Sequence, residues 1–191
     1  MRFVDRLLQR WRIARAGHWL AAGDAVLDVG CADGALFRQL RCLGPGVGVE
    51  PTLDAPRAVG RSELRPGRVP DAVPPGRTFD AVTLLAVLEH VPSGAQRALA
   101  DACARLVRPG GVAVITVPAP AVDHVLAVLR FLRLVDGMSL EQHFGFEPDD
   151  VPHVFAGPSW ELVRRQSFQL GLNNLFVFRR IPANADLVPT P

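Results

Sequence analysis

The chain has 191 residues, of which 49% are hydrophobic and 21% are charged, and its formal net charge is +2. This length and balance are typical of one globular domain with a full core. The net charge is too small to favour nucleic acid as a partner, and no run of 18 or more uncharged apolar residues predicts a transmembrane helix.

The residue types set further limits on the chemistry. All 21 basic residues are Arg and the sequence has neither Lys nor Tyr, so neither can act as a general base. The three cysteines, Cys31, Cys42 and Cys103, lack CxxC spacing, which argues against both a disulfide framework and a zinc site. We therefore expect a protein of the reducing cytoplasm that holds no metal.

The two ends of the chain differ from its middle. Residues 1–20 are basic and amphipathic, which predicts an N-terminal helix that covers the domain and could lie on an anionic membrane surface through residues 2–15. Its apolar side chains recur at helical spacing, at Phe3, Leu7, Leu8 and Trp11. The segment lacks the apolar core and cleavage site of a signal peptide. Residues 181–191 are Pro-rich and aperiodic, which predicts a disordered tail.

Short apolar runs alternate with helical segments along residues 21–180, which we expect to form the domain. The expected strands are residues 25–30, 46–50, 79–88 and 112–117, followed by an antiparallel pair at 160–170 and 175–180. The expected helices are residues 35–43, 93–107 with Ser93 as cap, 121–135 and a last one within 147–155. Residues 51–78 give weak signals, where Asp54 could cap a short helix and residues 67–70 could hold a short strand.

This alternation predicts an α/β fold: a single doubly wound, Rossmann-like domain whose central sheet is mostly parallel, with an antiparallel C-terminal strand pair. In such sheets, ligands bind beyond the carboxyl ends of the strands, near the point where the strand order reverses.

The segment "AVLDVGCADGALFRQL", residues 25–40, lies where such a site is expected. Gly30 and Gly34 allow a sharp turn and let backbone N–H groups approach a ligand, and the helix that follows adds partial positive charge. Glu50 ends the next strand, where an acid can accept hydrogen bonds from both hydroxyls of a ribose. The segment therefore predicts a nucleoside site.

Two ligand classes share this geometry. A dinucleotide would require close approach of its diphosphate at "GCADGA", where Ala32 stands at the central position and Asp28 and Asp33 would repel the phosphates. S-adenosylmethionine carries a cationic sulfonium and no phosphate, so acidic residues around the turn suit it. The charges favour the sulfonium ligand.

The chain resembles the class I S-adenosylmethionine-dependent methyltransferases over residues 22–180. The matching motifs are "VLDVGCADG", "GVGVEP", "FDAVTLLAVLEHVP" and "LVRPGGVAVITVP", in this order. The resemblance implies cofactor contacts at Asp28, Gly30, Cys31, Ala32, Gly34, Glu50, Pro51 and Leu85. Ala32 replaces the middle glycine of the first motif, and we expect it to fit with a negative φ. Asp71 is a candidate for the adenine contact.

Methyl transfer from a sulfonium is an in-line displacement, so the protein mainly aligns the reactants and excludes water. An oxygen acceptor often requires a general base. The candidates are Glu89 and His90, just after the fourth-strand motif, and His143 in "EQHFGF". The apolar segment 125–146 would form part of a lid over a small or lipid- or sugar-linked acceptor.

Two other interpretations stay open. The chain could be a non-catalytic S-adenosylmethionine-binding partner protein, because the turn is altered and no base is obvious. An NAD-dependent oxidoreductase is disfavoured, because the sequence has no second substrate domain and no Tyr/Lys pair. Nucleic acid is also disfavoured as a substrate, because no Asn-Pro-Pro-aromatic segment follows the fourth strand and no basic stripe extends beyond the N-terminal segment. The sequence does not indicate an oligomeric state.

Overall fold

The computed structural model describes residues 3–119 and 146–182. The strands are β1 (Val26–Val29), β2 (Val47–Glu50), β3 (Arg57–Val59), β4 (Ser62–Pro66), β5 (Phe79–Leu85), β6 (Val107–Pro118), β7 (Trp160–Phe168) and β8 (Asn173–Arg180). The helices are α1 (Phe3–Gly17), α2 (Ala35–Gln39), the 3-10 helix η1 (Leu88–His90), α3 (Ser93–Leu106) and α5 (Asp150–Val154).

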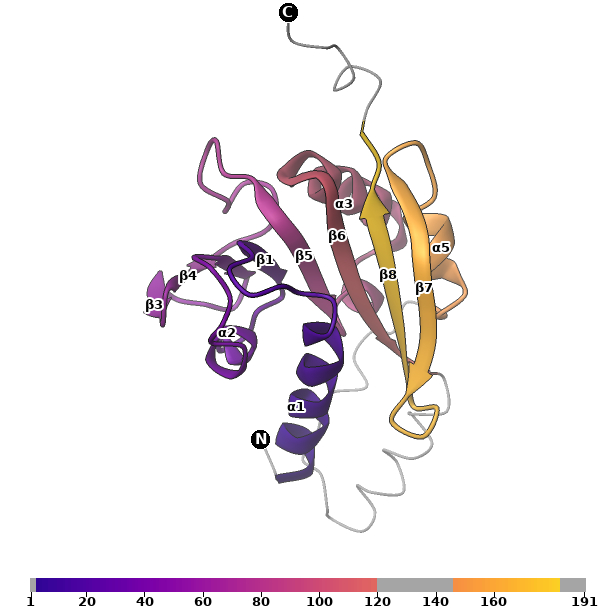
Figure 1. Cartoon of the computed structure of the whole chain (residues 1–191), viewed down its shortest axis with the longest axis horizontal. Helices are drawn as coiled ribbons and strands as arrows, with labels where there is room; N and C mark the ends of the chain where they lie inside the picture. Colours follow the sequence, from indigo (N-terminus) through magenta and orange to yellow (C-terminus); the bar gives the residue numbers. More distant parts are fainter. Residues whose placement is uncertain (1–2, 120–145, 183–191) are drawn as a thin grey trace, which may run out of the picture.

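These strands form one sheet, in the order β3-β4-β2-β1-β5-β6-β8-β7 (Figure 1). The five strands from β4 to β6 run parallel, whereas β8 and β7 are antiparallel, as is β3 at the other edge. The chain moves outward from β1 to β2 and β4, then returns to place β5 on the other side of β1. The strand order therefore reverses between β1 and β5, which confirms the expected α/β class and locates the site edge.

Helices cover both faces of the sheet, with α1 crossing one face and α3 and α5 on the opposite one (Figure 1). Because side chains alternate along a strand, β1 serves two cores. Leu27 and Val29 pack in the cluster that includes residues of α3 and α5. Val26 packs with Ile13 of α1 and Leu36 of α2.

The N-terminal helix is confirmed, and Leu7 and Trp11 of its apolar stripe are not on the face that it buries. Leu7 and Trp11 are 52% and 44% exposed, whereas Ile13 and Ala16 are buried against the sheet. Small Ala16 lets the helix approach Val114 closely, so close packing rather than side-chain size decides the buried stripe. No helix within residues 3–119 and 146–182 is long and apolar enough to cross a bilayer.

The weakly patterned stretch 51–78 contains a hairpin, and both expectations for it were wrong. Asp54 caps no helix, and residues 67–70 form a turn rather than a strand. Instead, β3 pairs antiparallel with β4 across a tight connection in which Gly60 has a φ of 59°. Parallel pairing of β4 with β2 holds this hairpin on the sheet, a non-local contact that propensity cannot predict.

Several helices and strands begin or end at residues other than the predicted ones. α2 ends at Gln39 rather than residue 43, because the chain turns back so that Gly44 N–H donates to Asp24 O at 2.8 Å. β5 ends at Leu85, because Ala86 has a φ of 59° and no strand continues through it. Ser93 begins α3 without making a side-chain cap bond.

The remaining expectations have mixed outcomes. β6 begins at Val107 and so extends further toward the N-terminus than residues 112–117. The short helix within 147–155 and the antiparallel C-terminal pair are confirmed by α5, β7 and β8. The helix expected at 121–135, and residues 183–191 of the expected tail, lie outside the described residues.

Candidate functional site

The turn after β1 lies at the point where the strand order reverses. Gly30 N–H donates to Val49 O at 2.8 Å, and Gly34 N–H donates to Cys31 O at 2.8 Å. Both glycines are left-handed, with φ of 70° and 82°. This conformation favours glycine and turns the chain from β1 into α2 across residues 30–34.

The two glycines also make room for neighbouring side chains. A Cβ on Gly30 would lie 2.5 Å from Val87 Cγ2, in the loop after β5. A Cβ on Gly34 would lie 2.9 Å from Leu64 Cδ1 of β4. The glycine pattern therefore serves packing between the turn and its neighbours, in addition to the backbone approach expected from the sequence.

Ala32 does not have the expected negative φ; its φ is 45°. The turn imposes this conformation, because Ala32 is bonded on both sides: its N–H donates to Glu50 Oε2 at 3.2 Å, and its carbonyl accepts from Arg57 Nη2 at 3.4 Å. Left-handed backbone is unfavourable for alanine by about 1–2 kcal/mol. Ala32 thus adopts the conformation suited to glycine and strains the turn.

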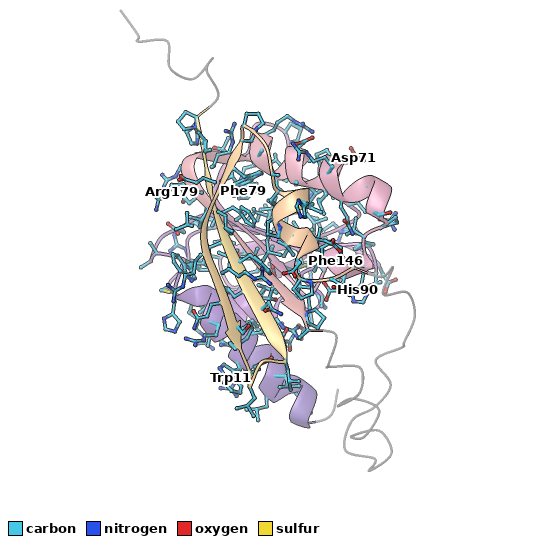
Figure 2. The ribbon with its side chains drawn as sticks, turned by 90° about the vertical axis from the view of Figure 1, so that its right-hand side faces the viewer. Trp11, Asp71, Phe79, His90, Phe146 and Arg179 are labelled. Carbon is cyan, nitrogen blue, oxygen red and sulfur yellow. The ribbon has the colours of Figure 1, made fainter. Side chains whose placement is uncertain are left out.

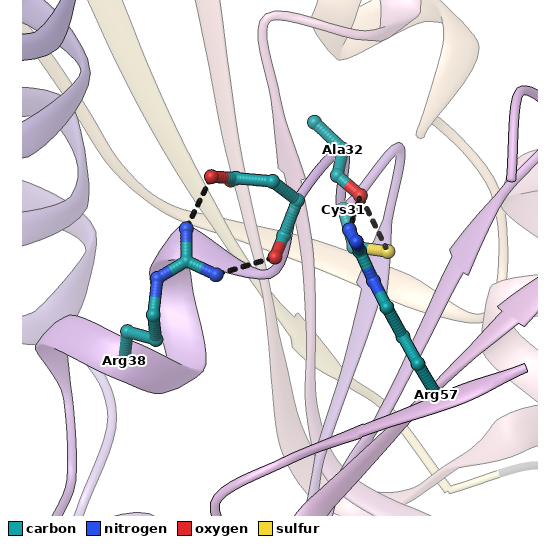
Figure 3. A network of polar contacts seen from close by, with 5 residues as sticks. Cys31, Ala32, Arg38 and Arg57 are labelled. Atoms are coloured by element: carbon teal, nitrogen blue, oxygen red, sulfur yellow. Dashed lines mark hydrogen bonds and ion pairs between the residues drawn. The ribbon is translucent and has the colours of Figure 1, made fainter.

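The side chains next to Ala32 point in different directions. The Cys31 thiol is buried close to Gly48, and burial raises the pKa of Cys31 to about 12. Only the backbone of Cys31 is therefore suited to contact a ligand. Asp33 forms an ion pair with Arg38, whose guanidinium also donates to the Asp33 carbonyl (Figure 3).

Glu50 is fixed at the end of β2 by three hydrogen bonds. Oε2 accepts from Ala32 N–H, and Oε1 accepts from Thr52 N–H at 3.0 Å and from the Thr52 hydroxyl at 2.8 Å. An ionised carboxylate has about four acceptor positions. The half-buried Glu50 therefore retains one acceptor position for a ligand. A second acceptor position becomes available when the Thr52 hydroxyl rotates away. Pro51 follows in an exposed turn.

Asp28 lies within β1, where it is 4% exposed and accepts a hydrogen bond from Thr83 Oγ1 at 2.6 Å. Burial raises the pKa of Asp28 to about 7; the bond from Thr83 opposes this rise and the charge of Glu50 adds to it. Two acidic groups therefore interact unfavourably at this edge, and a cation bound nearby would relieve their repulsion.

The loop after β5 carries the other predicted residues. Leu85 is half-buried and packs toward α1, while Glu89 in η1 is 1% exposed. Burial raises the pKa of Glu89 to about 7, opposed by a backbone hydrogen bond and by the charge of Arg12 in α1. The neighbouring His90 is exposed (Figure 2).

Two further candidates were predicted from the sequence. Asp71 is exposed in the turn after β4, and His143 lies outside the described residues. Within residues 3–119 and 146–182, no three His, Cys, Asp or Glu side chains are arranged to hold a metal ion.

Sequence reasoning missed three residues near Glu89: Arg12, Thr116 and Asn173. Each has a buried polar atom without a hydrogen-bond partner among the described residues. They come from α1, β6 and β8, so no local motif connects them. The one available signal was Thr116, a polar residue that interrupts the apolar run of β6.

Two grooves lined by described residues lie away from the turn. One of about 310 Å³ lies between α1 and β7, beside Arg15, Trp19 and Arg164. Another of about 490 Å³ lies beside α3 and α5 and includes Arg97 and His153. Neither is lined by the predicted cofactor residues, so we locate the site from the strand ends and their polar groups.

Comparisons with known proteins agree with this geometry. A family model described as "Methyltransferase domain" matches residues 2–163. The chain is 36% identical over 206 residues to a ubiquinone biosynthesis O-methyltransferase of Thiobacillus denitrificans, covering 93% of this chain and 86% of that protein. It is 39% identical over 119 residues to the protein of that name from Pseudomonas paraeruginosa, covering 56% of this chain and about half, 49%, of that protein.

Among solved structures, the magnesium protoporphyrin IX methyltransferase of Synechocystis PCC 6803, with bound SAH, superposes with a TM-score of 0.65 at 17% identity. The match covers 94% of this chain and 88% of that one, and it shows a shared fold. Together with the family model, this likeness shows that the chain belongs to the class I S-adenosylmethionine-dependent methyltransferases.

Proposed function

We propose that this chain transfers a methyl group from S-adenosylmethionine to a hydroxyl group of a small molecule. The observation that carries this proposal is the anchored Glu50 carboxylate beside the glycine turn, where the strand order reverses. The names of the relatives, which are O-methyltransferases, support an oxygen acceptor.

The residues present fit a cationic nucleoside. In this proposal Glu50 accepts hydrogen bonds from ribose hydroxyls, and the unfavourable interaction between Asp28 and Glu50 supports a positively charged ligand. The backbone of Cys31 and Ala32 lies on the same turn, with Leu85 and Val87 across from it. When bound, S-adenosylmethionine supplies the electrophilic methyl carbon.

Of the two predicted catalytic residues that the structure describes, Glu89 and His90, Glu89 is the buried one. A general base is most effective when its pKa is close to the working pH, and burial raises the pKa of Glu89 to about 7. In the proposed step, the acceptor oxygen forms the new C–O bond while the S–C bond breaks. Its proton passes to Glu89 Oε2, an atom without a hydrogen-bond partner among the described residues.

Calorimetry first tests cofactor binding, and a turnover assay then tests methyl transfer. Titration with S-adenosylmethionine, S-adenosylhomocysteine and NAD should show binding of the two sulfur ligands and none of NAD. Incubation with methyl-labelled cofactor and a set of small phenols, amines and thiols should then give a labelled methyl ether. Failure to bind either sulfur ligand at millimolar concentration would overturn the proposal.

The second candidate function is a non-catalytic cofactor-binding partner protein. The altered turn supports it, because Ala32 stands in a strained left-handed conformation there. Cofactor binding with no labelled product from any acceptor class would support this alternative over the enzyme.

The location and the contacts of the protein are also proposals. Three free cysteines, two of them buried, support the cytoplasm as its compartment. The exposed Leu7 and Trp11 on the basic helix α1 support contact with an anionic membrane surface. Sedimentation with anionic vesicles, compared with zwitterionic ones, tests the membrane contact.

A further inference from the structure

A group of buried polar atoms beneath α1 lacks hydrogen-bond partners among the described residues. The atoms are Arg12 Nε, Glu89 Oε2, Thr116 Oγ1 and Asn173 Oδ1. Glu89, Thr116 and Asn173 are 1%, 0% and 5% exposed. Buried polar side chains are nearly always bonded, so several unpartnered atoms in one region need an explanation.

Pairing across the sheet brings Thr116 and Asn173 together. Thr116 in β6 stands opposite Leu85 of β5 on one side and Leu175 of β8 on the other. Asn173 is two residues before Leu175, so its side chain is on the same face as Thr116. Both therefore face α1 at the end of the sheet where β5 leads into η1.

Helix α1 packs over this region, on the side opposite the sheet. Arg12 is close enough to Glu89 for their charges to interact. One helical turn earlier, the carbonyl of Leu8 accepts a hydrogen bond from Gln169 at 2.9 Å, and Gln169 in turn accepts from Asn173. Figure 2 shows Trp11 on the same helix, beside the connection between β7 and β8. The four unpartnered atoms thus lie between α1 and the sheet, next to the loop after β5.

The chemistry of these atoms selects a ligand. Arg12 offers a donor, Thr116 can donate or accept, and Asn173 and ionised Glu89 offer acceptors. A carboxylate ligand would be attracted by Arg12 but repelled by Glu89. An ammonium ligand would be attracted by Glu89 but repelled by Arg12. A hydroxyl group both donates and accepts, carries no charge and satisfies both kinds of atom.

We propose that Arg12, Glu89, Thr116 and Asn173 form the subsite that holds the hydroxyl groups of a neutral methyl acceptor. Thr116 and Asn173 hold the acceptor, and Arg12 is a positioning residue that orients Glu89. This inference rests on the proposed function, because the subsite adjoins the loop that would border the cofactor. It adds that the acceptor is neutral, and it assigns roles to Arg12, Thr116 and Asn173.

The first test compares the stability of isosteric variants. Thr116→Val removes an unpartnered polar atom and no printed side-chain hydrogen bond, so its melting temperature should stay equal or rise. Thr83→Val is the matched control: Thr83 is a buried threonine on the same face, but it is bonded to Asp28, so this variant should melt at a lower temperature. A drop for Thr116→Val as large as that of the control would overturn the proposal, because it would show that Thr116 has a structural partner.

The second test measures fragment binding by ligand-detected NMR on the full chain saturated with S-adenosylhomocysteine. The probes are catechol, benzoate and benzylammonium. Catechol should bind most tightly to the wild-type protein, and its Kd should rise about tenfold or more in Thr116→Val and Asn173→Leu, a change that removal of one or two hydrogen bonds can produce. Arg12→Gln should weaken catechol less and shift the pH dependence of its binding.

The outcomes separate the inference from the function on which it rests. If S-adenosylhomocysteine binds but catechol binds no better than the two ions, or equally well to the variants, the inference is wrong and the proposed function stands. If S-adenosylhomocysteine does not bind to the wild-type chain, the proposed function and the inference both fall.

Discussion

The two halves of the carboxyl edge of the sheet differ in how their polar groups are paired. Around the turn after β1, the side chains of Glu50, Asp28 and Asp33 are bonded to Thr52, Thr83 and Arg38. Beneath α1, Glu89, Thr116 and Asn173 each keep an atom without a partner among the described residues. The first half is thus organised before any ligand binds, whereas the second half has hydrogen-bonding capacity to offer.

This difference follows from how each half is built. The turn after β1 and the side chains bonded around it come from segments that are close in sequence or adjacent in the sheet. Their polar groups can therefore form hydrogen bonds with one another. The region under α1 combines residues from one helix, one loop and two strands. Polar groups that remain unpaired there lower stability, so their presence points to a binding role. The predictions below test each half.

Replacing Gly30 by Ala should have the largest effect. The new Cβ would lie 2.5 Å from Val87 Cγ2 at a φ of 70°, so clash and backbone strain combine. We expect the free energy of unfolding in urea to fall by about 2–5 kcal/mol. Gly23→Ala is the control, because its φ is 89° but nothing lies within 4 Å of its Cβ. Equal losses in the two variants would show that Val87 does not restrict the turn.

Replacing Glu50 by Ala should weaken cofactor binding. Loss of the ribose bonds should cost about 1–3 kcal/mol, which is roughly a 5- to 150-fold rise in Kd measured by calorimetry. Glu63→Ala is the matched control, because Glu63 pairs with Arg65 on β4. An unchanged Kd for Glu50→Ala would contradict the assignment of Glu50 to the ribose.

Replacing Asp28 by Asn should stabilise the protein in a pH-dependent way. The native pKa of about 7 exceeds the ordinary 3.8, so Asp28 contributes stability below about pH 4 that is lost as the pH rises through 7. Asn does not titrate and still accepts from Thr83. We expect the free energy of unfolding to rise by about 1–3 kcal/mol at pH 8, with the gain shrinking toward pH 5.

Urea unfolding of both proteins at pH 5, 6, 7 and 8 measures this gain. A difference between Asp28→Asn and wild type that stays constant over the series would mean that the carboxyl is not destabilised by burial.

Replacing Ala32 by Gly should have the smallest effect, and a favourable one. Relief of about 1–2 kcal/mol of left-handed strain exceeds the roughly 0.5–1 kcal/mol of added entropy in the unfolded chain. We expect a gain of about 0.5–1 kcal/mol in the free energy of unfolding, by these same two effects. The control Ala35→Gly, at the start of α2, should lose stability instead. A loss in both variants would mean that Ala32 is not strained.

Much of the fold could be predicted because it rests on local patterns. The apolar runs predicted β1, β2, β5, β6, β7 and β8, and the order of helices and strands predicted the sheet class. The hairpin of β3 and β4 was missed, because its sequence "RAVGRSELRP" has no alternation strong enough to outweigh its polar residues. Only pairing with β2 makes it part of the sheet.

The candidate site also contains some residues that the sequence predicted and others that it did not. Gly30, Gly34 and Glu50 were found from their spacing, because a turn and the end of the next strand have fixed places in such folds. Thr116 and Asn173 were not, because what distinguishes them is the missing partner, and partners are known only once strands are aligned. The buried face of α1 could not be predicted either, since the sheet packs against the face with Ala16.

The sequence by itself determined the class of the fold, the position of the turn and the acid at the end of β2, because each depends on residues near one another along the chain. The tertiary structure alone decided that Ala32 is left-handed, that Glu89 is buried beside Arg12, and that Gln169 bonds to Leu8 across 161 positions of sequence. Burial and hydrogen bonding act between surfaces that meet only after folding, so no local pattern of residue types can specify them.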